Sequence, residues 1–196
     1  MFTPLLVLGN AIDWPGSLDL PPAEALPLIL SEAEAVQLGY GIYLGYSVLW
    51  VVTGSLIAFS ISAEKHPTSP LLITAIAFIC ASAFARAIGI MRWLTSAPIL
   101  ADAHSQVDPE TSLAIETMQA AIDSWGGAIG EYLGVAFFTS LWLIAIAMLV
   151  FKHKVLPIWI GWSAVIVAPI LASPITELFG FQASIFVSTL VFHLWL

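Results

Sequence analysis

Residues 70–91 read PLLITAIAFICASAFARAIGIM, 22 consecutive residues in which Arg86 is the only charge. A helix of about 20 apolar residues crosses the hydrocarbon core of a bilayer, because each residue advances a helix by about 1.5 Å. The stretch therefore predicts a membrane-spanning helix, and the arginine inside it needs an explanation.

Four further stretches have the same apolar character: 38–62, 131–151, 156–173 and 181–196. Over the whole chain 60% of residues are hydrophobic and 9% are charged, whereas soluble domains carry about 25% charged residues. No stretch shows the sustained apolar–polar alternation of a membrane barrel strand. The sequence predicts an all-α polytopic transmembrane helix bundle with five full spans. Residues 5–9 read as the end of a helix that starts earlier, which would make six spans in a complete protein.

The spans divide the chain into an N-terminal segment, 1–37, predicted to be extracytoplasmic, and a bundle, 38–196, with an outer loop at 92–130. Within this loop Asp108 and Pro109 suit the start of a helix. The apolar residues that follow have the three- and four-residue spacing of an amphipathic helix: Ile115, Met118, Ile122, Trp125 and Ile129. Gly126 and Gly127 are predicted to break this helix, and the N-terminal segment is predicted to pack against the loop.

Lysines in short loops predict the orientation, because such loops stay on the cytoplasmic side. Lys65 lies in the loop 63–69, and Lys152 and Lys154 lie between the third and fourth spans, whereas most acids occupy the alternating segments. The chain is therefore predicted to lie in the inner or plasma membrane with its acidic loops outside. The net charge of −8 and the absence of a basic cluster argue against a nucleic-acid partner.

Several segments bring charge to the predicted outer face: Arg86, Arg92, Glu131, Glu177 and Asp13. Ionisable groups at membrane depth are usually paired and often mark a functional site. Two interpretations of Arg86 stay open, a side chain that snorkels to lipid headgroups and one that pairs with Glu131. The cluster as a whole is either a structural ion-pair network or a ligand site.

Small residues recur at four-residue spacing in two places. Gly126, Gly130 and Gly134 form one row, and Gly41 and Gly45 form another. Glycine rows allow helix backbones to approach closely in lipid, so both rows are predicted to pack against neighbouring helices.

The four histidines are scattered, and their spacing predicts no metal site. His193 lies in the last apolar stretch and is a candidate ligand for haem or chlorophyll, with hydrogen-bonded packing as the alternative. No nucleophile elbow, P-loop or dinucleotide fingerprint is present. The cofactor remains unknown, and the pattern favours a protein that is not an enzyme.

The stretch from Arg86 to Gly161 resembles a bacterial multi-pass membrane family catalogued as a domain of unknown function (number forty-three eighty-six). The resemblance rests on Trp14-Pro15 and on motifs further along the chain: Met91-Arg92-Trp93, Pro98-Ile99-Leu100-Ala101, Gly130-Glu131-Tyr132-Leu133-Gly134, Leu141-Trp142 and Leu156-Pro157-Ile158-Trp159-Ile160-Gly161-Trp162. It implies a six-helix bundle with both termini cytoplasmic, and it supplies no activity.

Two hypotheses of different class follow. The leading one is an accessory or structural subunit that packs in a larger membrane complex, with lipids and other membrane subunits as its partners. The alternative is a protein that binds or transports a lipid or small molecule at a charged site on the outer membrane face.

Overall fold

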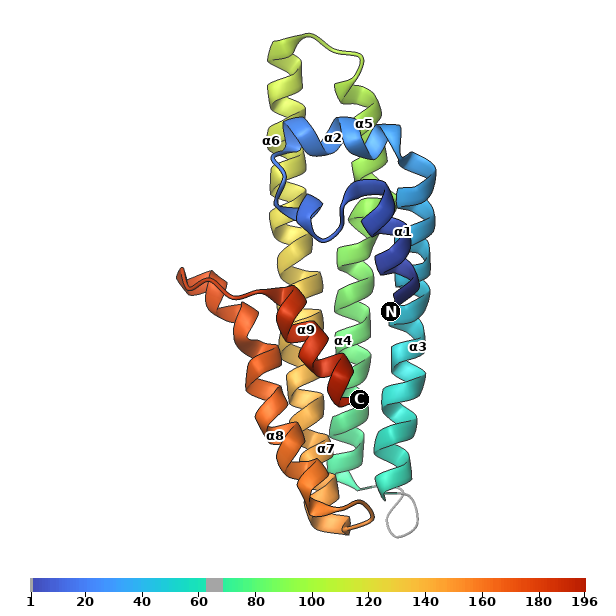
Figure 1. The fold of residues 1–196 in the computed structure, drawn as a ribbon, viewed down its shortest axis with the longest axis vertical. Coiled ribbons are helices and arrows are strands. Elements are labelled where there is room, and N and C mark those ends of the chain that lie inside the picture. The colour runs from blue at the N-terminus through green and yellow to red at the C-terminus, as the bar shows by residue number, and fades with distance from the viewer. Residues whose placement is uncertain (1, 63–68) are drawn as a thin grey trace. The chain divides into compact units, whose positions relative to one another are not determined.

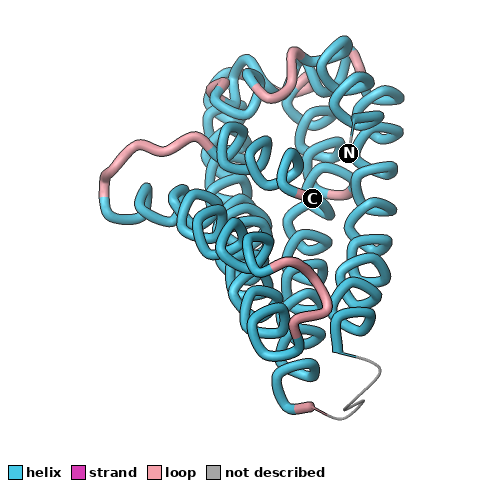
Figure 2. Tube along the Cα trace, turned by 60° about the horizontal axis from the view of Figure 1, so that its bottom comes forward, coloured by secondary structure: helices cyan, strands magenta, loops and turns pink. Residues whose placement is uncertain are grey.

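The computed structural model describes residues 2–62 and 69–196, and these residues form helices and connecting turns without strands (Figures 1 and 2). The predicted all-α architecture is confirmed. The chain divides into two compact units. We call Met1–Tyr46 with Ala87–Ala128 the acidic unit, and Ser47–Arg86 with Ile129–Leu196 the apolar unit.

The acidic unit contains the start of α3 (Ala33–Ser62), the end of α4 (Pro70–Leu94) and five shorter elements: α1 (Phe2–Ile12), η1 (Gly16–Asp19), α2 (Pro22–Ser31), α5 (Ser96–His104) and α6 (Pro109–Gly127). Helix α2 packs on α5 and α6, so the predicted contact between the N-terminal segment and the 92–130 segment is confirmed. Leu26, Trp93 and Ala97 are buried in the core of this unit.

Helix α6 starts where the sequence predicts. The Asp108 carboxylate accepts hydrogen bonds from the backbone N–H groups of Glu110 and Thr111, at 3.0 and 3.1 Å, and from the Thr111 hydroxyl. These bonds satisfy N–H groups that have no partner within the helix. They hold the pKa of the Asp108 carboxyl below its usual value, with the Thr111 N–H as the largest cause.

This cap makes the start of α6 sensitive to acid. A lowered folded-state pKa means that the cap stabilises the helix above the usual aspartate pKa and is lost as the pH falls through the folded-state value. Amide hydrogen exchange at Glu110 and Thr111 should therefore accelerate on acidification, relative to the intrinsic rate. Asp108→Ala should exchange fast at every pH, and Asp108→Asn, which keeps a capping oxygen, should lose the pH dependence. An unchanged profile in Asp108→Ala would contradict the cap.

The apolar unit contains the remaining parts of α3 and α4, followed by a π-helix, η2 (Ala128–Phe138), which starts at the last residue of the acidic unit. The rest of the unit is α7 (Thr139–His153), α8 (Ile158–Ala172), η3 (Ser173–Phe179) and α9 (Ile185–Trp195). Helix α7 packs on α8, and α9 packs on α8 and η3. Trp142, Leu143 and Phe192 are fully buried in the core of this unit.

Four helices within the described residues are long and apolar enough to cross a membrane: Ala33–Ser62, Pro70–His104, Pro109–His153 and Ile158–Phe179. Three of these helices expose large apolar side chains, since Leu56, Phe84 and Ile166 are 61–71% exposed. Large exposed apolar side chains spread over several helices suit lipid rather than water. The protein is a helical membrane protein.

The fifth predicted span differs from the expectation. Within residues 181–196 the helix is α9, 11 residues long, which is about 16 Å. Helix α9 begins at Ile185, four residues after the start of the predicted span. The Ser184 hydroxyl accepts a hydrogen bond from the Val187 N–H and caps the helix there.

The predicted break at Gly126 and Gly127 is wrong, because helical structure continues without interruption from Pro109 to His153. A glycine inside a helix costs only about 1 kcal/mol relative to alanine. Both glycines leave room for the side chain of Arg92, which packs directly on them.

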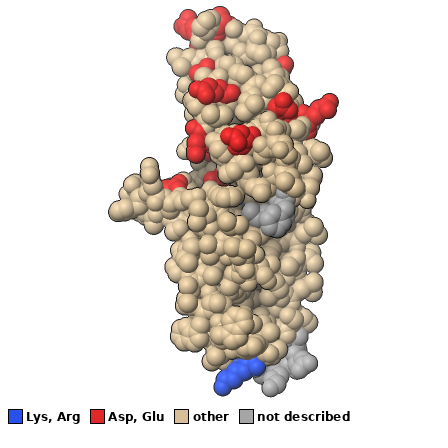
Figure 3. Space-filling view, viewed as in Figure 1, with Lys and Arg blue, Asp and Glu red and all other residues tan. Residues whose placement is uncertain are grey.

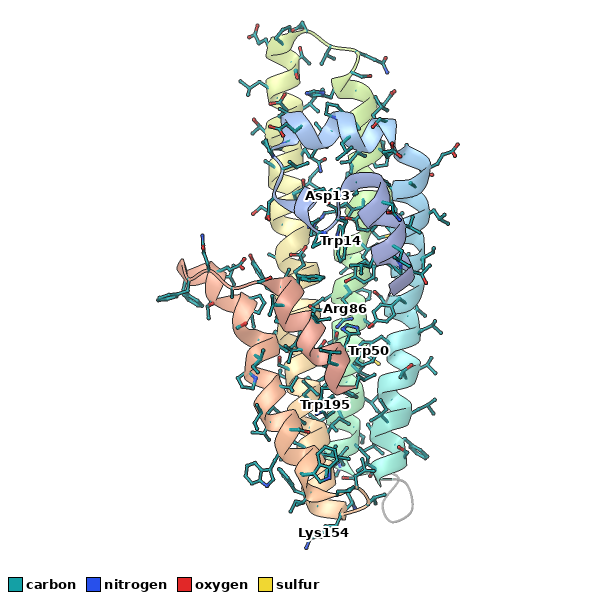
Figure 4. The ribbon with its side chains drawn as sticks, viewed as in Figure 1. Asp13, Trp14, Trp50, Arg86, Lys154 and Trp195 are labelled. Atoms are coloured by element: carbon teal, nitrogen blue, oxygen red, sulfur yellow. The ribbon has the colours of Figure 1, made fainter. Side chains whose placement is uncertain are left out.

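The charges are unevenly divided between the units. The acidic unit carries ten of the 13 acidic residues of the chain and one of its five basic residues, and Figure 3 shows acidic side chains on its surface. In the apolar unit Lys154 ends α7 and points into open space (Figure 4). Lys65 and His66 of the predicted cytoplasmic loop lie outside the described residues.

Candidate functional site: a buried arginine beside a π-helix

Gly134 brings α4 and the π-helix η2 into close contact within the apolar unit. A Cβ atom added at Gly134 would lie 2.9 Å from the backbone nitrogen of Arg86 and 3.1 Å from the carbonyl oxygen of Ser82. The Ser82 hydroxyl donates a hydrogen bond to the Gly134 carbonyl at 2.7 Å. The missing side chain therefore allows the two helix backbones to approach closely and the Ser82 hydroxyl to bond to the Gly134 carbonyl.

This contact positions Arg86. Its Nη2 donates to the Thr139 hydroxyl at 2.9 Å, and Thr139 in turn donates to the Gly134 carbonyl at 3.0 Å. The guanidinium lies over the ring of Trp50 on α3, 6.0 Å from its centroid (Figure 4). Side chains from α3, α4 and α7 thus converge on one cation.

Arg86 is 3% exposed, and its Nε–H is buried without a hydrogen-bond partner. Among residues 2–62 and 69–196 no carboxylate forms an ion pair with it. A guanidinium remains charged in proteins, and an arginine in the middle of a membrane helix costs about 2.5–3.5 kcal/mol even on insertion scales. The site therefore holds a buried positive charge whose described contacts are a hydroxyl and an aromatic ring.

The predicted pairing of Arg86 with Glu131 is not what the structure shows. Glu131 lies eight residues before Thr139 on the same continuous helix. Because Gly134 sets the contact between α4 and η2, Arg86 faces Thr139 instead of Glu131. Snorkelling does not fit either, since the side chain is buried.

The second arginine, Arg92, is also buried beside glycines, inside the acidic unit. Its Nε lies 3.4 Å from Asp123 Oδ1, and its Nη1 donates to the Asp123 carbonyl at 2.9 Å. Added Cβ atoms at Gly126 and Gly127 would come within 2.8 Å and 3.1 Å of the Arg92 side chain. Arg92 therefore has a carboxylate partner, whereas Arg86 has none within the described residues.

The remaining predicted site residues occupy separate places. Asp13 lies in the acidic unit, exposed in the turn after α1 (Figure 4). Glu131 is half-buried in η2 of the apolar unit. Glu177 lies in η3, where it accepts hydrogen bonds from the Tyr132 hydroxyl at 2.7 Å and from the Ala183 N–H at 3.3 Å. Glu177 therefore ties η3 and its following loop to η2.

The two glycine rows differ in their surroundings. Gly130 is buried. At Gly126 and at Gly134 an arginine side chain occupies the space that a side chain at the glycine position would take. Gly41 and Gly45 are exposed, and added Cβ atoms there would meet nothing within 4 Å. The first row makes room for two buried cations, and the second leaves an open face on α3.

His193 lies on α9, where its Nδ1 is 2.7 Å from the Thr189 carbonyl. A carbonyl only accepts, so this nitrogen carries a proton and donates to its own helix. In the described part of the chain no group of three His, Cys, Asp or Glu side chains could hold a metal ion. His104 instead contacts Glu116 at 2.9 Å.

Comparison with known proteins supplies the family. A family model described as "Domain of unknown function (DUF4386)" matches residues 5–196. The chain belongs to this family. No curated protein and no solved structure matches the chain.

In this family member, sequence reasoning singled out Arg86 and Gly134 but missed Thr139, Ser82 and Asp123. Thr139 and Ser82 are ordinary small polar residues in apolar stretches, and nothing in their spacing marks them. Ser82 lies four residues before Arg86 on α4 and so shares its helix face, which was the one available signal.

Proposed function

We propose that this protein binds a lipid or small molecule that carries a negatively charged oxygen group, and that Arg86 holds this group. The observation that supports the proposal is the burial of Arg86 without a carboxylate partner among the described residues. A buried charge that lacks a counter-charge is costly, and an anionic ligand would supply one. Buried ionisable groups in membrane helices are functional candidates by default.

The π-helix strengthens this interpretation. π-Helical segments are rare in proteins and often occur at functional sites. Here the π-helix contains Gly134, and its carbonyl accepts from both Ser82 and Thr139. The Gly134 carbonyl thus holds the Thr139 hydroxyl that contacts the arginine.

The test is mass spectrometry of the protein purified in mild detergent and kept intact. Wild type should retain an anionic molecule at one copy per chain, and Arg86→Gln should lose it. Lys154→Gln removes a positive charge from an exposed turn and should retain the molecule. An empty wild type, or equal retention in Arg86→Gln, would refute the proposal.

A second candidate function is an accessory subunit in a larger membrane complex. It is favoured by the open face at Gly41 and Gly45 on α3, since small residues in lipid allow a partner helix to approach. Stoichiometric partner proteins should then co-purify with wild type and be lost in Gly45→Leu. The neighbouring exposed Val48→Leu is the control and should retain them.

We also propose the orientation that the lysines predict, with the acidic segments on the extracytoplasmic side of the inner or plasma membrane. Cys80 is exposed and must first be replaced by serine. In that background an impermeant thiol reagent added to intact cells should label Gln106→Cys, in the turn before α6, and spare Val155→Cys, in the turn after α7. The reverse labelling pattern would overturn the orientation.

A further inference from the structure

Three buried N–H donors without partners belong to side chains that contact one another in the apolar unit. Arg86 Nε, Trp50 Nε1 and Trp142 Nε1 are all buried and have no hydrogen-bond partner among the described residues. The Arg86 guanidinium lies over Trp50, and the rings of Trp50 and Trp142 are 5.4 Å apart in a T-shaped contact. Buried donors in folded proteins are almost always paired, so three unpaired donors in one contact network require an explanation.

The cluster is short of acceptors. The Gly134 carbonyl already accepts from Ser82 and Thr139, and the Thr139 hydroxyl already accepts from Arg86. An aromatic ring face is a weak acceptor compared with an oxygen atom, so the ring contacts do not satisfy the indole N–H groups. What the cluster lacks is an oxygen that accepts several hydrogen bonds and bears negative charge.

The charge of the cluster limits the ligand. Arg86 supplies one positive charge, and the other described basic residues of this unit, Lys152 and Lys154, are exposed at the end of α7. A single negative charge would be neutralised in this low-dielectric core, whereas a double charge would leave one buried and uncompensated. The surrounding side chains are apolar and aromatic, with Phe192 packed on Trp50 at 5.4 Å.

We propose, building on the proposed function, that the ligand is an amphiphile with a monoanionic headgroup, a carboxylate or a phosphodiester, and that Trp50 and Trp142 bind this headgroup together with Arg86. A carboxylate or phosphodiester offers several acceptor lone pairs and fits the fork of a guanidinium. The ligand's hydrocarbon part suits the apolar core around the cluster.

Helix α9 closes the site. Phe192 is fully buried against Trp50, and Trp195 on the same helix donates to the Ser163 hydroxyl on α8 at 2.8 Å (Figure 4). The three donors are buried in this arrangement, and Phe192 of α9 covers Trp50, so we expect α9 to move away when a ligand enters. The Trp195–Ser163 hydrogen bond joins α9 to α8. Because Ser163→Ala removes this bond, we expect the variant to exchange its ligand faster than wild type.

The experiment measures binding of oleate to lipid-stripped protein in nonionic detergent by titration and mass spectrometry. Wild type should bind one oleate, and oleyl alcohol and inorganic phosphate, which lack the charge and the tail respectively, should bind at least tenfold more weakly. Trp50→Phe and Trp142→Phe keep the ring and remove the N–H, and each should weaken oleate binding about tenfold, the effect of losing one hydrogen bond to a charged group. Trp159→Phe, at a 66% exposed position, is the control and should bind as wild type does.

A second arm separates the two sources of the headgroup. Dioleoyl phosphatidylglycerol carries a monoanionic phosphodiester, and dioleoyl phosphatidylcholine has the same tails without net charge. Preference for oleate over phosphatidylglycerol assigns a carboxylate, and the reverse preference assigns a phosphodiester headgroup. Binding of phosphatidylcholine as tight as that of both would overturn the proposal.

The outcomes also separate this inference from the proposed function. If an anionic molecule co-purifies in an Arg86-dependent manner but both Trp→Phe variants bind like wild type, the tryptophan inference is wrong and the proposed function stands. If inorganic phosphate binds as tightly as oleate, the amphiphile class is wrong. If neither a retained molecule nor oleate binding depends on Arg86, both proposals fail.

Discussion

Gly134→Leu should abolish the native packing of the apolar unit, with a loss of at least about 3 kcal/mol of stability. A Cβ alone would stand 2.9 Å from the backbone nitrogen of Arg86 and 3.1 Å from the Ser82 carbonyl oxygen. Backbone atoms in the middle of a helix cannot move aside as the end of a flexible side chain can. Overpacking typically costs 1–3 kcal/mol and more where nothing gives way, and here the Ser82–Gly134 hydrogen bond would break as well.

The measurement is the thermal transition of the purified protein in detergent. Gly45→Leu is the matched control, because an added Cβ at Gly45 meets nothing within 4 Å and leucine is as apolar as lipid. Gly134→Leu should melt far below wild type or fail to purify folded, and Gly45→Leu should melt within a few degrees of wild type. Gly134→Ala should fall between the two. Equal melting of the two leucine variants would show that η2 and α4 do not touch at this glycine.

The second large effect concerns Thr139. Thr139→Val preserves the shape of the side chain but removes the hydroxyl that accepts from Arg86 at 2.9 Å. The buried guanidinium then loses its hydrogen-bond partner, and we expect a loss of about 2–3 kcal/mol. Arg86→Met, which removes the buried charge and keeps an unbranched apolar chain, should leave stability within about 1 kcal/mol of wild type or raise it.

The double-mutant cycle tests this directly. In the Arg86→Met background Thr139→Val should cost less than about 1 kcal/mol, because no stranded charge remains, so the two residues should show a coupling of about 2 kcal/mol. Thr53→Val is the control, since the Thr53 hydroxyl bonds at 3.1 Å only to the Leu49 carbonyl of its own helix. Equal costs for Thr139→Val and Thr53→Val in lipid-stripped protein would show that Thr139 does not support the arginine.

The contrast between the two arginines shows where sequence reasoning stopped. Both were visible as charges near the end of one apolar stretch, and for Arg86 the sequence left snorkelling and pairing with Glu131 both open. Arg92 found its carboxylate in Asp123, 31 residues away on α6, and Arg86 met Thr139, 53 residues away on α7. No local sequence pattern predicts either partner. Which residue meets each arginine depends on how two helices, separated by a long segment of the chain, align along each other.

The glycines show a similar limit. Four-residue spacing indicates a flat helix surface, but spacing alone does not say what lies on it. At Gly126 and Gly134 it is the stem of an arginine, and at Gly41 and Gly45 it is open space. The sequence could identify the rows, whereas the occupant of each row follows from tertiary packing.

By itself the sequence determined the membrane class, the helical architecture, the presence of four long apolar helices and the capped start of α6. These features depend on composition and on neighbours within a few residues, which the chain carries locally. Tertiary structure decided that the helix continues through Gly126 and Gly127, that α9 starts only at Ile185, and that Arg86 is buried against a hydroxyl and an indole. The physical reason is that each of these features has a small local cost, such as a glycine inside a helix. Contacts that form only once distant helices have packed offset that cost.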